Sequence, residues 1–282
     1  MASDSHYPVS PISAKSLAID LLSTIPGRYQ VPVGALVRAA GILGVGENSM
    51  RVALARLRAS GLVRSGERGL YRLSSDAEPI NRHVRSWRTI ENRSSKWDGS
   101  WVGLEPVRGA GARRSRLAVR LLGFRPLTKA LQVRPNNLEG GVEVVRQRLE
   151  SLAQGNGGLV FRLAELDSET DGRARSAWDT SALEAGYVAT LERLRESEAR
   201  LPTLSQDAAM SESFLLGGEA VRQIVLDPLL PAPIIDVDAR RALVDAMRRY
   251  DRVGRRYWKA WAGEAIELEQ SPAAIGGLAA TR

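Results

Sequence analysis

The sequence predicts an α+β protein made of two mixed domains followed by a helical one. Apolar residues at helical spacing alternate with short extended runs bounded by glycine through the first two thirds of the chain. The last third contains only long helical patterns. A chain of 282 residues is long enough for each such domain to bury its own core. We expect the domains to span residues 1–80, 81–170 and 171–282.

The most informative part of the first domain is Gly46–Leu73. Its first half places one apolar residue on every turn of a single helix face, at Met50, Ala53, Leu54 and Leu57. The opposite face is short, polar and basic, and Gly61 is placed to end the helix in a left-handed conformation. Two short apolar runs, Leu62–Val63 and Leu70–Leu73, then flank a glycine-containing loop, which predicts a β-hairpin.

Two further helices are expected before this one, over Ala14–Ser23 and Val33–Ala40, with a short extended piece at Val31–Val33 and a glycine-rich turn at 41–46. The order helix, helix, turn, helix, hairpin is that of a winged helix-turn-helix. In such a domain the third helix enters the major groove of DNA and the hairpin reaches the neighbouring backbone. A helix and hairpin inside an unrelated α+β domain is the alternative.

Residues 74–96 are polar and cationic, so we expect a solvated linker, although Trp87 and Ile90 would suit a connecting helix and a DNA-contacting arm is the alternative. The second domain then follows the order βαββαβ, which is ferredoxin-like. Its expected elements are a strand at 101–107, a helix at 113–122, extended pieces at 125–127 and 130–134, a helix at 138–152 and a strand at 159–163.

The third domain is predicted to contain helices over Leu183–Arg195, Asp207–Leu226 and Asp238–Trp261, the second interrupted at Gly217–Gly218. The last helix interleaves arginines with aromatic residues. Nucleic-acid-binding helices share that pattern, but we expect the aromatic side chains to pack inward and the arginines to stay solvated.

The net charge of +8 is concentrated in the first two domains, which carry +3 and +7, whereas the third carries −2. A cationic surface of this kind suits an anionic partner such as DNA or a phosphorylated ligand. Seven cations fall between Arg113 and Arg134. They form either a solvated face or a phosphate-binding patch.

Catalysis, cofactors and membrane insertion are not expected. The chain has no cysteine and two histidines, His6 and His83, and it lacks a phosphate-binding glycine loop and a nucleophile elbow. No metal site is predicted, and Asp236 and Asp238 are expected to cap the last helix. No run approaches the ~18 apolar residues of a membrane span, and the N-terminus lacks signal-peptide features, so we expect a cytoplasmic protein.

The order of these motifs resembles the PaaX-type transcriptional repressors, which regulate phenylacetate catabolism in bacteria. The residues that carry the resemblance are Gly44–Val63, Gly69–Ser74, Trp97–Trp101 (WDGSW), Arg120–Asn137, Trp178–Tyr187 and Ala220–Pro231, which contains DPLLP. The resemblance implies a homodimer that binds double-stranded operator DNA and releases it when an aryl-CoA thioester or related aromatic metabolite binds. It also implies a middle domain similar to small CRISPR-adaptation nucleases of ferredoxin-like fold.

Two departures qualify this resemblance. Gly46 and Glu47 stand where such winged helices often have a polar N-cap and a basic residue, so the bases that are read can differ. The strand at 101–107 has no Asp for metal-dependent cleavage. This argues against nuclease activity, so a metal-dependent nuclease with a DNA-targeting domain is kept only as the alternative function, and a DNA-bending protein of low sequence specificity is a third.

We predict two sets of site residues. The DNA-binding set lies on the third helix and the hairpin: Asn48, Ser49, Arg51, Arg56, Arg64 and Arg68. The effector-binding set combines cations for the phosphates of an acyl-CoA with indole rings for its acyl group: Trp97, Trp101, Arg113, Arg114, Arg116, Arg134 and Trp178.

Overall fold

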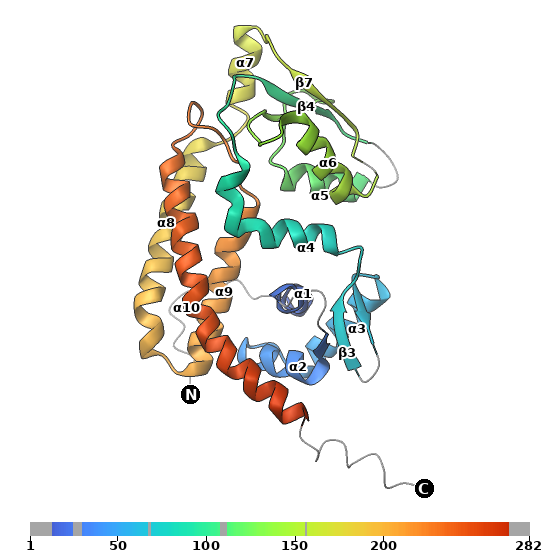
Figure 1. Ribbon diagram of the computed structural model, residues 1–282, viewed down its shortest axis with the longest axis vertical. Coiled ribbons are helices and arrows are strands. Elements are labelled where there is room, and N and C mark those ends of the chain that lie inside the picture. Colours follow the sequence, from blue (N-terminus) through green and yellow to red (C-terminus); the bar gives the residue numbers. More distant parts are fainter. Residues whose placement is uncertain (1–12, 25–29, 67–68, 108–111, 156, 271–282) are drawn as a thin grey trace. The chain divides into compact units, whose positions relative to one another are not determined.

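The computed structural model describes residues 13–24, 30–66, 69–107, 112–155 and 157–270, with only the backbone described for Ala112 and for residues 260–270. This part of the chain is α+β, as predicted, and contains two small antiparallel sheets (Figure 1). The chain divides into two compact units. The first comprises residues 1–78, 194–218 and 248–282, and the second comprises residues 79–193 and 219–247.

The first unit begins with three short helices and a three-stranded sheet. The elements are α1 (Ala14–Thr24), β1 (Val31–Pro32), α2 (Val33–Ile42), α3 (Glu47–Ala59), β2 (Val63–Ser65) and β3 (Leu70–Leu73). The strands lie in the order β1-β3-β2, and both pairings are antiparallel. Helix α1 packs against both α2 and α3. The boundaries agree with the predicted ones to within a few residues.

The core of this unit is formed by the apolar faces of these helices. All four residues of the predicted stripe on α3 are buried, with Met50, Leu54 and Leu57 fully inaccessible to solvent. Three side chains from distant parts of the chain pack against the same core, namely Phe214, Leu215 and Trp258. They come from α9 (Gln206–Val225) and α10 (Val237–Gln270). Residues far apart in sequence therefore complete the core of the first unit.

The last helix buries aromatic side chains, as predicted. The Trp258 indole N–H donates to the carbonyl of Met210 at 3.1 Å, and its ring centroid lies 5.3 Å from that of Phe214. Tyr250 is 1% exposed, and its hydroxyl lies 2.7 Å from Ser197 Oγ on α8 (Thr180–Arg200). The short helix η3 (Leu201–Thr203) connects α8 to α9.

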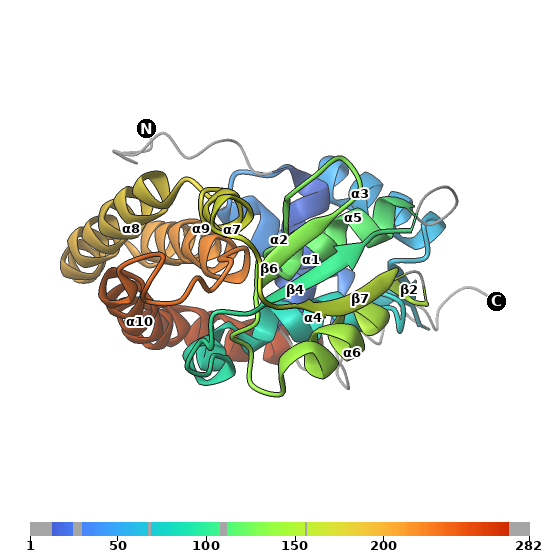
Figure 2. The ribbon, with the colours of Figure 1, turned by 90° about the horizontal axis from the view of Figure 1, so that it is seen from above.

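The second unit is organised around a four-stranded antiparallel sheet in the order β5-β6-β4-β7. Along the chain its elements are α4 (Glu78–Arg85), η2 (Ser86–Arg93), β4 (Trp101–Glu105), α5 (Ala112–Leu121), β5 (Arg125–Pro126), β6 (Gln132–Pro135), α6 (Gly141–Ala153), β7 (Leu159–Leu163) and α7 (Ser168–Arg175). Helices α5 and α6 pack side by side on one face of the sheet (Figure 2). The central strand β4 contains Gly103, which lies opposite Phe161 in the register; a Cβ at this position would meet the Phe161 ring at 2.7 Å.

Two predictions about local structure were wrong, and one helix was missed. Residues 78–93 form α4 and η2 instead of a solvated linker, because Trp87 and Ile90 are 3% and 2% exposed and anchor the segment. Helix α9 continues through Gly217–Gly218, since packing of its apolar face outweighs the low helix propensity of glycine. Helix α7 was not predicted, because it is polar and offers no apolar periodicity.

A separate domain over residues 171–282 stays a prediction. In the division into two units, α8, α9 and α10 each contribute one part to the first unit and the other part to the second.

Candidate functional site

The outer face of α3 is a polar, cationic surface. Opposite the buried stripe, the side chains of Asn48, Ser49, Arg51, Val52 and Arg56 are all exposed. Val52, at 40% exposure, is one of the few large apolar side chains exposed in the described part of the chain, and the sequence analysis did not single it out. The helix starts after Gly46, which gives no side-chain cap, and the backbone turns away after Gly61 at a φ of +72°. The exposure of its side chains shows that this face is left uncovered by the described part of the chain.

Arg51 is engaged with a neighbour on the same helix. Its Nη2 lies 2.7 Å from Glu47 Oε1, and the two side chains are 51% and 59% exposed. An exposed pair at this spacing is worth only about 0.3–0.5 kcal/mol. The guanidinium can therefore exchange this carboxylate for a stronger anionic partner at little cost.

The hairpin adds two cations next to each other. In the antiparallel register Arg64 of β2 lies opposite Arg72 of β3, and both side chains are exposed. Like charges directly opposite in a sheet are unfavourable unless an anion lies between them. Arg72 was missed by the sequence analysis, although the predicted hairpin register contained it. Arg68, which was predicted to hold a phosphate, lies outside the described residues.

The three tryptophans of the predicted effector set converge in the second unit. The ring centroids of Trp97 and Trp101 lie 5.2 Å apart in an edge-to-face arrangement, and Trp101 stacks on Trp178 at 6.1 Å. The Trp101 indole donates to Asp171 Oδ1 at 2.9 Å, and Arg175 lies over the Trp97 ring at 4.8 Å. Trp101 is fully buried and Trp178 is 5% exposed, so Trp97 is the ring that solvent reaches.

The predicted cations do not join these rings in one site. Arg113 and Arg116 are exposed on α5. This helix follows the C-terminal end of β4, whereas Trp101 is the first residue of that strand. Arg114 is half-buried and donates through Nε to the carbonyl of Leu152 at 3.2 Å. Arg134 was expected on the same surface, but this expectation is wrong, since its side chain is buried on β6.

Arg134 has interior partners for its guanidinium. It donates to the carbonyls of Leu122 and Pro135 and to the side-chain oxygen of Asn137. Burial, and then the charge of Arg148, lower its pKa to about 9. The group therefore remains charged at neutral pH, and its position inside the unit excludes it from a surface patch.

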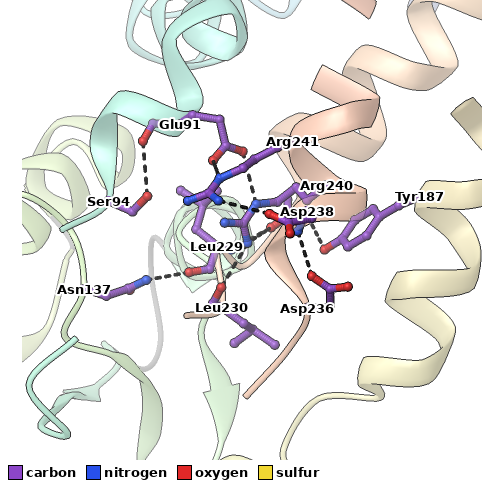
Figure 3. A network of polar contacts seen from close by, with 11 residues as sticks. Glu91, Ser94, Asn137, Tyr187, Leu229, Leu230, Asp236, Asp238, Arg240 and Arg241 are labelled. Carbon is purple, nitrogen blue, oxygen red and sulfur yellow. Dashed lines mark hydrogen bonds and ion pairs between the residues drawn. The ribbon is translucent and has the colours of Figure 1, made fainter. Parts of the chain in front are cut away.

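A buried polar network, which the sequence analysis missed, holds the DPLLP segment (Figure 3). Arg240 donates to Glu91 Oε1 at 3.2 Å and to the carbonyl of Leu230 at 3.0 Å, and it lies 3.7 Å from Asp227 Oδ1. The Tyr187 hydroxyl donates to the other oxygen of Asp227. Asn137 donates to the carbonyl of Leu229 at 2.6 Å. These contacts give the DPLLP segment a structural role within the second unit.

His83 is half-buried in the second unit. Burial, followed by the charges of Arg93 and Arg148, lowers its pKa to about 4, and hydrogen bonds to the backbone of Val225 and Leu121 oppose the change only in part. The imidazole is therefore neutral at physiological pH. No three His, Cys, Asp or Glu side chains gather as metal ligands among the described residues. In the same part of the chain, none of the helices combines the length and the apolar character needed to cross a bilayer.

Comparison with known proteins gives a family and a fold. Family models described as PaaX-like protein and PaaX-like protein C-terminal domain match residues 13–77 and 178–260, respectively. A search of curated proteins gave no match. The structure is similar to that of an uncharacterised protein, Rv0674 from Mycobacterium tuberculosis, with a TM-score of 0.52 and 23% identity over 87% of this chain and 99% of the other.

The two family models cover the helices and hairpin of the first unit and most of the C-terminal helices, and they account for more than half of the chain. The chain belongs to the PaaX-like protein family.

Proposed function

We propose that this protein is a transcription regulator that binds operator DNA through the first unit, with α3 as the recognition helix of a winged helix-turn-helix. The observation that carries the proposal is the division of α3 into a buried apolar stripe and an exposed polar, cationic face. An α-helix of this kind fits the major groove. The proposal is also supported by the membership of this chain in the PaaX-like protein family, because its resemblance to PaaX-type repressors implies transcription regulation.

The exposed side chains of α3 match the chemistry of base edges and phosphates. Arg51 and Asn48 can donate to purine bases, and Val52 offers an apolar contact for a thymine methyl group. Ser49 and Arg56 suit the phosphate backbone, which most protein–DNA hydrogen bonds contact. The paired cations Arg64 and Arg72 would place two charges on one stretch of backbone, which would offset their mutual repulsion.

The regulatory part of the proposal is a repressor of an aromatic-compound catabolic operon, released by an aryl-CoA thioester or related metabolite. The second unit, with its four-stranded antiparallel sheet, is proposed to have a ferredoxin-like fold and to contain the effector site. Arg113, Arg116 and the accessible ring of Trp97 are the surface groups of the predicted set. We further propose a homodimer, which would read two operator half-sites about 34–36 Å or a multiple of this distance apart.

Replacing Arg51 with alanine is expected to weaken operator binding by ~1–3 kcal/mol, because a bidentate contact to a base is lost. A duplex that the full-length protein binds would first be enriched from a random DNA pool. Its affinity for each variant would then be measured by fluorescence anisotropy at several salt concentrations. Arg64→Ala should instead weaken binding to enriched and scrambled duplexes alike and lower the slope of log K against log salt by about 1.

The control is Arg173→Ala, which removes an exposed arginine from α7 in the second unit and should leave affinity unchanged. If Arg51→Ala bound the enriched duplex as tightly as the parent at every salt concentration, α3 would not be the recognition helix. Loss of the duplex in the presence of a divalent cation would instead favour the nuclease alternative.

A further inference from the structure

The second unit contains a cluster of cations without acidic partners. Arg93 ends η2, Arg134 lies on β6, and Arg148 lies on the inward side of α6, three residues after the buried Val145. Neither Arg93 nor Arg148 forms an ion pair with a carboxylate of any described residue. Half-buried charges of one sign are costly, because burial weakens hydration and each charge repels the others.

Hydrogen bonds place Arg93 and Arg134 on the same short segment. The carbonyl of Arg93 accepts from the backbone N–H of Glu139 at 2.8 Å, while Arg134 Nη2 donates to Asn137 Oδ1 at 3.2 Å. Arg93 also donates to Ser86 Oγ, and this hydroxyl donates to the carbonyl of His83 at 2.6 Å. Elements η2, β6 and α4 thus meet at one place.

Arg148 completes the cluster. Arg148 is half-buried on α6, one of the two helices packed on the sheet of this unit. Burial, and then the charge of Arg148, lower the pKa of Arg93 to about 10, and the same charge is a lesser cause of the lowered pKa of Arg134 and of His83. Unlike Arg134, Arg148 has no protein hydrogen-bond partner in the described part of the chain. Arg93 and Arg148 are both partly exposed, and an external ligand can therefore reach them.

We propose that Arg93 and Arg148, together with the buried Arg134, form a binding site for an oxyanion, the phosphate or carboxylate group of a small molecule. Two guanidinium groups supply several N–H donors in the planar geometry that phosphate and carboxylate accept, and the third charge adds attraction from the interior. The neutral imidazole of His83 adds no further positive charge. The existence of this site does not depend on DNA binding; only its identification with the effector site rests on the proposed function.

The test measures the melting temperature of the full-length protein without DNA, with inorganic phosphate titrated against sodium chloride at equal ionic strength. Above its dissociation constant, phosphate should raise Tm by about 3–5 °C for each tenfold rise in concentration. Arg148→Gln should abolish this dependence and, in phosphate-free buffer, should melt at or above the temperature of the parent, because it relieves repulsion inside the cluster. Arg148→Lys should retain part of the response.

Arg146→Gln is the matched control, since Arg146 lies on the same helix, is exposed and is paired with Glu143. It should keep the full phosphate response. A lower melting temperature of Arg148→Gln without phosphate would overturn the proposal, because Arg148 would then have an intramolecular partner. The proposal would also be overturned if Arg148→Gln kept the phosphate response. A response that is lost only in Arg116→Gln on α5 would overturn it as well.

The same titration with benzoate and with free coenzyme A distinguishes the sources of the oxyanion. Stabilisation by coenzyme A at the lowest concentration would assign the site to a phosphorylated carrier, and stabilisation by benzoate would assign it to an aromatic acid. No stabilisation by phosphate, benzoate or coenzyme A would overturn the proposal. None of these outcomes involves operator affinity, so the site and the proposed function can fail separately.

Discussion

Replacement of Arg240 by alanine is expected to cost the protein about 3–5 kcal/mol of unfolding free energy. The Arg240 side chain is 5% exposed and contacts two carboxylates, that of Glu91 at 3.2 Å (Figure 3) and that of Asp227 at 3.7 Å. Its removal would leave Asp227, whose pKa is already raised by burial, without the cation that opposes this change. It would also leave the carbonyl of Leu230 without a donor. Urea unfolding of the full chain, followed by circular dichroism, measures the effect.

Arg241 supplies the control for this prediction. It is adjacent in sequence, 59% exposed, and paired with Asp238 at 3.1 Å and with Glu91 at 3.9 Å. Exposed pairs of this kind contribute about 0–1 kcal/mol, so Arg241→Ala should be nearly neutral. Equal losses of unfolding free energy in the two variants would show that the buried Arg240 network contributes no more to stability than the exposed ion pairs of Arg241. Because the chain has two units, a biphasic unfolding curve should show the loss in one phase only.

The same network shows why the DPLLP segment was recognisable as a motif but not interpretable from the sequence. Within it, Asp227 accepts from the backbone N–H of Leu229 at 2.7 Å, and Leu229 adopts a positive φ of 55°. Pro228 packs so closely on Gly123 that a Cβ at this glycine would lie 2.6 Å from Pro228 Cα. Glu91 and Arg240 are 149 residues apart in the sequence. The spacing of residues within a short segment cannot predict a contact over this separation, so the pairing can be identified only in the folded structure.

Patterns within one element were the predictable part. The stripe of Met50, Ala53, Leu54 and Leu57 is buried as expected, because a repeat of 3.6 residues determines which face of a helix can pack. The strand boundaries of the first hairpin followed from its glycines for the same local reason. The roles of the predicted DNA-binding residues stay predictions, since exposure makes them available without identifying their partner.

Predictions that depended on which way a charged side chain points were less successful. Val133 and Arg134 are successive residues of β6, so their side chains point to opposite faces of the sheet, yet both are buried. The partners of Arg134, such as the carbonyl of Leu122 and the side chain of Asn137, come from outside the strand. The sequence gives Arg134 the same appearance as Arg113 or Arg116, which are exposed. Composition therefore indicated a basic middle region correctly, but it could not separate a solvated cation from one inside the cluster with Arg93 and Arg148.

Stability is expected to fall by about 3 kcal/mol as the pH decreases from 6.5 to 4, because His83 stays neutral in the folded protein. Its pKa is lowered to about 4 by burial and by the charges of Arg93 and Arg148, whereas an unfolded histidine titrates near 6.5. Above pH 6.5 both states are neutral and the contribution is fully present. Between pH 6.5 and 4 only the unfolded state binds the proton, and the folded state therefore loses stability.

The measurement compares the pH dependence of urea unfolding for His83→Gln and its parent, both carrying His6→Gln, since the chain has only these two histidines. The buffers contain chloride and no phosphate, because an oxyanion at the proposed site would favour protonation of the neighbouring imidazole. His83→Gln should be less stable than its parent at pH 7 but should show a flatter profile between pH 6.5 and 5, where few carboxylates titrate. If both proteins lost the same stability over this interval, His83 would titrate normally, and the cations around it would be better solvated than the structure indicates.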